Sequence, residues 1–138
     1  MNPKILRMGI SLCIICMMIG CTSKGGRINT SYDFTAMANG VTKYQDKYEV
    51  DGIRITHSLS LLQFYPQGDA FLRYVNKYDK TEGDRHILIS KETRIVDANG
   101  RSIQPEKIEK GSKVNFTVYL IEDNYFLVAS EIKIADVE

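Results

Sequence analysis

The fold is decided by residues 114–134, which read VNFTVYLIEDNYFLVASEIKI. Apolar side chains recur at every second position of the first half, at Val114, Phe116, Val118 and Leu120. A second apolar stripe follows the polar turn of residues 122–124, at Phe126, Val128, Ile132 and Ile134. Alternation with period two is typical of strands with one buried face. The stretch therefore predicts two paired strands that share a core.

Upstream of this stretch, a second hairpin is expected around Asp51-Gly52. This dipeptide favours a type I′ turn, in which both central residues take positive φ. Tyr48 and Val50 would then share a face with Ile53 and Ile55. Residues 57–64 remain open between a strand and a short buried helical turn, because their leucines fit both periods.

Between the two hairpins, residues 70–78 are predicted to form a long strand with apolar side chains on both faces. Further strands are expected at residues 85–90 and 93–96, followed by a hairpin-type turn at residues 97–100. Pro105 to Lys110 favours one helical turn, with Pro near its start and Gly111 past its end. The sequence thus predicts five or more short strands and no long helix.

This pattern indicates an all-β fold, either a small OB-like barrel or a sandwich, with one short helical turn. Residues 93–97, Gly100, and residues 108–114 and 128–132 resemble small OB-like β modules of uncharacterised exported bacterial proteins. The resemblance covers residues 69–134 and implies an OB-like core without a known chemistry. Residues 32–64 would add strands to the barrel or pack over one end, which makes residues 32–138 a single domain.

The N-terminal segment has the features of an export signal. Lys4 and Arg7 precede an apolar run from Ile10 to Ile19, which is short for a membrane-spanning helix. Residues 18–21, Met-Ile-Gly-Cys, resemble a bacterial lipobox. The resemblance implies that residues 1–20 are a lipoprotein signal peptide and that Cys21 is the lipidated residue. Residues 21–31 would be a flexible tether, and the protein would be membrane-anchored in the cell envelope, outside the cytoplasm; an uncleaved single-pass anchor is the alternative.

Charge and residue usage argue against several functional classes. The full sequence has 18 basic and 17 acidic side chains, and removal of residues 1–20 takes away two basic ones and no acid. A near-neutral domain lacks the basic excess typical of nucleic-acid-binding proteins. The only histidines, His57 and His86, are expected to be partly exposed strand residues rather than metal ligands. Residues 79–84 have oxygen-bearing side chains but not the spacing of a calcium loop. No cofactor, metal or catalytic residue is therefore predicted.

Binding is the expected role of the domain. Tyrosine and arginine are common in binding surfaces because they combine a large contact area with polar groups. The candidate binding residues are Tyr65, Arg73, Tyr74, Tyr78, Arg94 and Tyr119. The first hypothesis is a non-catalytic module that binds a protein partner in the envelope. The alternatives are a small ligand or glycan in a barrel mouth, and an envelope hydrolase.

Overall fold

The computed structural model describes residues 30–78 and 84–135 of the 138-residue chain, apart from the side chain of Asp84. It contains five strands, one short α-helix and two 3₁₀ turns. The elements in chain order are β1 (Tyr32–Val50), β2 (Ile53–Leu62), η1 (Asp69–Phe71), α2 (Leu72–Lys77), β3 (Asp84–Val96), η2 (Pro105–Lys107), β4 (Lys113–Ile121) and β5 (Phe126–Ile134).

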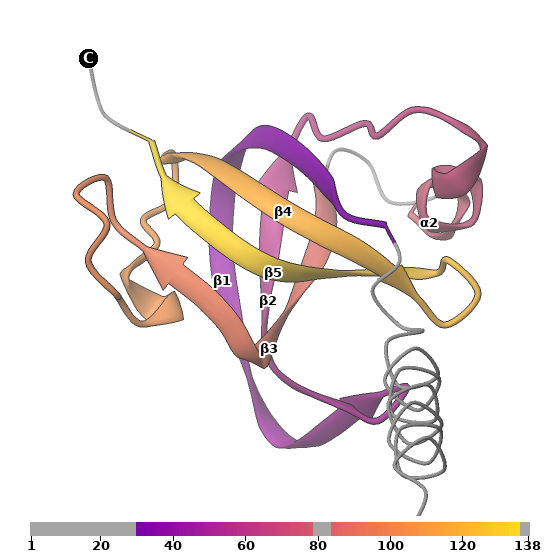
Figure 1. Cartoon of the computed structure of the whole chain (residues 1–138), viewed down its shortest axis with the longest axis horizontal. Helices are drawn as coiled ribbons and strands as arrows, with labels where there is room; N and C mark the ends of the chain where they lie inside the picture. The colour runs from indigo at the N-terminus through magenta and orange to yellow at the C-terminus, as the bar shows by residue number, and fades with distance from the viewer. Residues whose placement is uncertain (1–29, 79–83, 136–138) are drawn as a thin grey trace, which may run out of the picture.

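The five strands close into one barrel in the order β1-β2-β3-β5-β4 (Figure 1). All neighbouring strands are antiparallel except β3 and β5, which pair in parallel. The predicted OB-like barrel is confirmed, and the sandwich alternative is wrong. Residues 32–62, whose role the sequence left open, supply β1 and β2 and so nearly half of the barrel wall.

The two predicted hairpins are also confirmed. Asp51 and Gly52 have φ values of 51° and 76°, as a type I′ turn requires. Tyr48 lies opposite Ile55, and Val50 opposite Ile53. In the C-terminal hairpin Phe116 lies opposite Ile132. Period-two alternation and the turn residues were sufficient to predict these two hairpins, because both signals depend on residues that are close together in the chain.

The strand predicted at residues 70–78 is wrong, since this segment forms η1 and α2. Phe71, Tyr74, Val75 and Tyr78 have the i, i+3, i+4, i+7 spacing of one helical face. Phe71 and Tyr74 are buried, whereas Leu72 is exposed. The aromatic and β-branched composition suggested a strand with two apolar faces, but the chain buries only one side of this segment.

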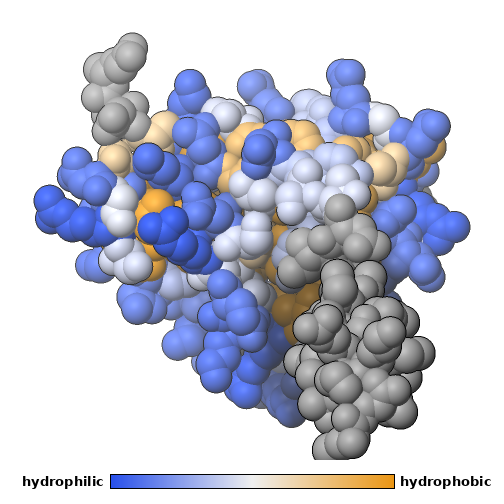
Figure 2. All heavy atoms as spheres, viewed as in Figure 1, coloured by the Kyte–Doolittle hydropathy of each residue, from blue (hydrophilic) through white to orange (hydrophobic). Residues whose placement is uncertain are grey.

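Apolar side chains form two clusters on opposite faces of the same strands. The inner cluster fills the barrel and includes Ile87 and Ile89 of β3. Leu88, between them, belongs to the outer cluster, whose buried members are Val50, Ile55, Leu88, Tyr119, Ile121 and Val128. The tip of the β1–β2 hairpin supplies the cover of this outer cluster, through Tyr44, Tyr48 and Ile53. On the face drawn in Figure 2, hydrophilic side chains predominate and apolar ones show in small areas.

The barrel has two dissimilar ends along its longest axis (Figure 1). The start of β1, α2 and the β4–β5 turn lie at one end, on the right of the view. The β3–β4 loop, with η2, lies at the other end. The Tyr32 and Phe71 rings meet edge to face with centroids 4.7 Å apart, which fixes the start of β1 against η1.

Candidate functional site

Irregularities in β2 and β3 create a groove at the end that carries η2. The β2–β3 register shifts between Ile55 and His57, so Thr56 is an extra residue that directs its side chain to the same side as His57. The β3–β5 register shifts between Ile89 and Arg94. The strands therefore bend here instead of continuing a flat sheet.

Hydroxyl groups hold the bend of β3 in place. The Ser90 N–H donates to Thr93 Oγ1 at 2.9 Å, and Thr93 Oγ1 donates to the Ala129 carbonyl at 2.6 Å. The Glu92 N–H donates to Ser90 Oγ at 3.2 Å. These bonds satisfy backbone groups that the interrupted ladder would leave unpaired. The groove is therefore a built feature of the strands.

The groove has a volume of about 350 Å³, and polar and apolar groups contribute about equally to its surface. Its lining combines hydroxyl and amide groups with two cations, and comprises Thr56, His57, Ile89, Ser90, Lys91, Thr93, Arg94, Ile95, Ser102, Ile103, Gln104 and Pro105. Lys91 and Arg94 are exposed. Arg94 Nη1 lies 2.9 Å from Glu131 Oε2, and both side chains are open to solvent. Such an exposed pair contributes little stability, so Arg94 can change partners at small cost.

His57 lies at the edge of this groove and is only 7% exposed. Its Nε2 is 2.7 Å from Glu106 Oε1 and its Nδ1 is 2.8 Å from Thr56 Oγ1. A carboxylate can only accept, so Nε2 carries a proton, and in the neutral ring Nδ1 is an acceptor. The single hydroxyl proton of Thr56 has two acceptors in reach, this Nδ1 and the Ile89 carbonyl at 3.4 Å, and Nδ1 is the nearer one. The hydrogen bond from His57 is the main cause that lowers the pKa of Glu106. The expectation that His57 is partly exposed is wrong, because the β2 bulge turns it into the barrel end.

η2 brings Glu106 to His57 across 49 residues of sequence. Pro105 starts this turn, and the Ile108 N–H donates to the Pro105 carbonyl at 3.1 Å. Ile108 then packs into the inner cluster. The short helical turn expected from Pro105 to Lys110 thus forms over Pro105–Lys107 and positions the Glu106 carboxylate beside His57.

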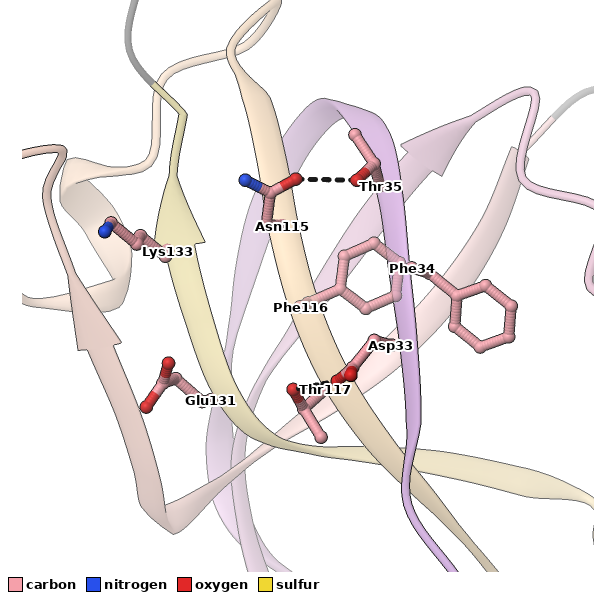
Figure 3. Close-up of a pocket in the computed structure, with 8 residues that line it drawn as sticks. All are labelled: Asp33, Phe34, Thr35, Asn115, Phe116, Thr117, Glu131 and Lys133. Atoms are coloured by element: carbon pink, nitrogen blue, oxygen red, sulfur yellow. Dashed lines mark hydrogen bonds between the residues drawn. The ribbon is translucent and has the colours of Figure 1, made fainter.

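A second hollow of about 350 Å³ lies on the outer face of β1, β4 and β5 (Figure 3). Thr117 Oγ1 donates to Asp33 Oδ1, and Thr35 Oγ1 donates to Asn115 Oδ1, both at 2.6 Å. Figure 3 shows these two pairs joining β1 to β4. These four side chains are paired across the strands and so connect β1 to β4. Because they already have partners, they are less available to a ligand than the polar groups of the groove.

The candidate binding residues chosen from the sequence do not come together. Tyr74 is fully buried in the inner cluster, where its hydroxyl donates to the His86 carbonyl at 2.8 Å. Tyr119 is buried in the outer cluster. The prediction that Tyr74 and Tyr119 belong to a binding surface is therefore wrong. Both rings pack in the core, because the inner cluster buries one side of α2 and the outer cluster buries the second face of β4.

The other four candidates are at least partly accessible but lie apart. Tyr78 is half-buried beside Tyr74, with ring centroids 5.2 Å apart. Tyr65 is exposed, with the Arg85 guanidinium 4.3 Å from its ring centroid. Arg73 lies over the Tyr125 ring. Arg94 alone belongs to the groove.

Sequence reasoning missed most of the groove, including Thr56, His57, Ser90, Lys91, Thr93 and Gln104. Short polar residues such as serine and threonine carry no spacing signal within a strand. The bulge that brings Thr56 beside His57 is a property of the β2–β3 pairing, so the neighbouring residues in the chain do not predict it. The Pro105-Glu106 dipeptide marked a helical turn but not the residue it would contact.

Within residues 30–78 and 84–135, no group of three or more His, Cys, Asp or Glu residues could hold a metal ion. No helix in these same ranges is both long and apolar enough to cross a membrane. The lipobox-like residues with Cys21, and most of the acidic loop weighed as a calcium site, lie outside the described residues.

A search of protein-family models, of characterised proteins and of solved structures finds no match to this chain.

Proposed function

We propose that the protein is a lipid-anchored lipoprotein of the bacterial envelope, and that its barrel is a non-catalytic module that binds a protein partner through the groove. The observation that carries this proposal is the separation of the two ends of the barrel. The chain enters the domain beside Phe71 at one end, and residues 102–105 of the groove belong to the β3–β4 loop, which lies at the other end. An anchor at Cys21 would therefore leave the groove free to face a partner.

The shape and chemistry of the groove support a polypeptide partner over a small ligand. Small-molecule sites are mostly apolar and enclose most of the ligand surface. This groove is open, and polar groups make up about half of its surface. Lys91 and Arg94 add positive charge, and the hydroxyl and amide groups add hydrogen-bonding capacity. An acidic peptide segment matches this combination, since carboxylates can pair with both cations.

Two experiments test the two halves of the proposal. Replacement of Cys21 by Ala should leave an unprocessed precursor or move the protein to the soluble fraction, measured by fractionation and mass spectrometry. A Cys21→Ala protein that stays with the membrane at its processed size would exclude lipid anchoring at this residue.

Binding is tested by NMR titration of residues 21–138 with a glutamate-rich peptide and a lysine-rich peptide of equal length. The acidic peptide should shift resonances of residues 90–94 and 102–104. Lys91→Glu with Arg94→Glu should weaken its binding at least tenfold, whereas the exposed Lys113→Glu should not. Equal binding of both peptides, or shifts elsewhere, would contradict an acidic partner at the groove.

One observation favours a hydrolase as the second candidate. Thr56, His57 and Glu106 form a hydroxyl–imidazole–carboxylate chain with the bond order of a nucleophile, a base and an orienting acid. In this arrangement Nδ1 would take the proton of Thr56 as the hydroxyl attacks the carbonyl carbon of an ester, and would give it to the alcohol that leaves when the ester C–O bond breaks. Water, deprotonated by the same Nδ1, would then release the acid from the acyl-Thr56 intermediate. Hydrolysis of an activated ester faster than buffer, lost in Thr56→Val and kept in the outer-face control Thr35→Val, would favour the hydrolase over the binding module.

A further inference from the structure

The end of the barrel at which the chain enters carries exposed apolar side chains. Leu72 of α2 is 53% exposed, and Tyr125 of the β4–β5 turn is 44% exposed. Arg73 connects the two elements, because its guanidinium carbon lies 5.6 Å from the Tyr125 ring centroid. Lys77, one turn further along α2, places its ammonium 3.3 Å from the Phe126 ring centroid. We call Leu72, Arg73, Lys77, Tyr125 and Phe126 the entry surface.

The chemistry of the entry surface matches the interface of a lipid bilayer. Tyrosine is enriched at that interface, because its ring enters the acyl boundary while its hydroxyl stays hydrated. Long cationic side chains cover apolar area and direct their charge to the headgroups. Both cations here lie over aromatic rings, so cationic and aromatic side chains are in contact at this surface. In Figure 2 hydrophilic and apolar atoms lie side by side at this end of the molecule.

The covalent connection limits how far this surface can be from an anchor at Cys21. Tyr32, the first residue of β1, packs on Phe71, which directly precedes Leu72. Ten residues lie between Cys21 and Tyr32 in sequence, so the eleven Cα–Cα steps that connect them reach at most about 40 Å, and about 18 Å on average for a flexible chain. A domain of about 100 residues has a radius of gyration near 13 Å. The end that carries the entry surface is therefore the one that meets the membrane first.

We propose that the entry surface docks on the lipid bilayer, with Leu72 and Tyr125 inserted at the headgroup boundary. This inference rests on the proposed anchoring through Cys21. Two apolar side chains are too few to hold a free domain on a membrane. A short tether supplies an effective concentration on the order of millimolar, which is sufficient to populate a weak contact. Docking would orient the barrel, with the groove directed away from the lipid.

The acidic neighbours of the entry surface predict how docking depends on lipid charge. Asp69 of η1 and Glu122 and Asp123 of the β4–β5 turn are also exposed, and they offset the charges of Arg73 and Lys77. Attraction to anionic headgroups is then weak, since these three acids and two cations leave little net charge among the described residues of these elements. Docking should therefore persist on zwitterionic vesicles and depend on apolar contact.

The experiment uses residues 21–138, in which Cys21 is the only cysteine. These residues contain the closed barrel and both clusters that form its core. The Cys21 thiol is coupled to a maleimide lipid in phosphatidylcholine vesicles. Chemical coupling supplies the anchor whether or not a cell acylates Cys21. Failure of docking is thus separated from failure of the anchoring proposal, which the fractionation of Cys21→Ala tests.

Because the chain contains no tryptophan, single-tryptophan variants report contact with the lipid. Brominated phosphatidylcholine should quench Tyr125→Trp at least threefold more than Asn99→Trp, which lies in the β3–β4 loop at the opposite end. Adding Leu72→Glu to Tyr125→Trp should abolish the difference. The matched control Met37→Glu changes another exposed apolar residue, located about 16 Å along β1 from Tyr32, and should leave it unchanged.

Three results would overturn docking on the bilayer. Equal quenching of Tyr125→Trp and Asn99→Trp would show that the tethered domain has no preferred face. Loss of quenching when each vesicle carries a single coupled protein would show that the entry surface joins two copies of the chain. An unchanged signal in Leu72→Glu would remove this surface from the contact.

Discussion

The inner and outer clusters are built from the same strands but differ in what closes over them. Inner residues such as Phe116 and Val118 are surrounded by five strands and capped by Phe71 and Tyr74 at one end. Outer residues such as Val128 are covered by the tip of one hairpin, where the β1–β2 register breaks between Lys43 and Tyr48. A cavity made by a substitution inside the barrel stays open, because strands surround it on all sides. A cavity beneath the hairpin can be filled, because the hairpin covers the outer cluster from one side and can shift toward it. We therefore expect the same loss of volume to cost more inside the barrel.

Phe116→Ala should have the largest effect. Its ring contacts those of Phe34 and Phe64, with centroids 5.9 and 5.3 Å away. Removal of a fully enclosed aromatic ring should destabilise the domain by roughly 3–5 kcal/mol, measured by urea denaturation. An unchanged melting temperature would place Phe116 outside the core.

Val118→Ala and Val128→Ala test the difference between the clusters directly. Both valines are fully buried, but Val118 belongs to the inner cluster and Val128 to the outer one. We expect a loss of about 2–3 kcal/mol for Val118→Ala and about half of that for Val128→Ala, because the hairpin can collapse on the smaller side chain. Equal losses in chemical denaturation would mean that the hairpin is as rigid as the barrel.

Alkaline pH should lower the stability of the domain through Tyr78, which packs against the inner cluster. Burial is the main cause that raises the pKa of Tyr78 to about 12, and nearby Tyr44 and Tyr48 add to it. The ordinary value, near 10, applies to the unfolded chain. A raised folded pKa means that stability is present below pH 10 and is lost as the pH rises from 10 to about 12.

Tyr78→Phe should therefore remove part of the alkaline loss of stability, seen by urea denaturation at pH 9 and 11. Tyr32→Phe, which removes the hydroxyl of another half-buried tyrosine, serves as the control. The same alkaline slope in Tyr78→Phe and wild-type protein would exclude Tyr78 as its source.

Glu106→Gln should have the smallest effect on stability, since Glu106 is exposed and belongs to neither cluster. Its pKa is lowered by the hydrogen bond from His57, so the stability that it adds is present above its ordinary value of 4.5 and lost below it. In Glu106→Gln the free energy of unfolding, measured by urea denaturation, should depend less on pH below 4.5 than in the wild-type protein. At pH 7 it should be nearly unchanged. A large loss at pH 7 would indicate that the pair holds the end of the barrel together.

The sequence by itself determined the two hairpins and the fold class. Period-two alternation in residues 114–134 and the positive φ of Asp51-Gly52 depend only on neighbours in the chain. The resemblance to OB-like modules extended this to a barrel, but it did not say how residues 32–64 would take part. The error at residues 70–78 has the same origin. Local composition favoured a strand, while the helical spacing of the buried side chains was also present and proved decisive.

The tertiary structure decided where the polar groups meet. The strand order β1-β2-β3-β5-β4 places the second faces of β3, β4 and β5 beneath the β1–β2 hairpin, and so buries Tyr119 instead of exposing it. A one-residue bulge turns Thr56 and His57 to the same side, and a turn 49 residues away supplies Glu106. The energy of such contacts depends on strand register and chain closure, which are properties of the whole barrel, so no local pattern of residues encodes the groove.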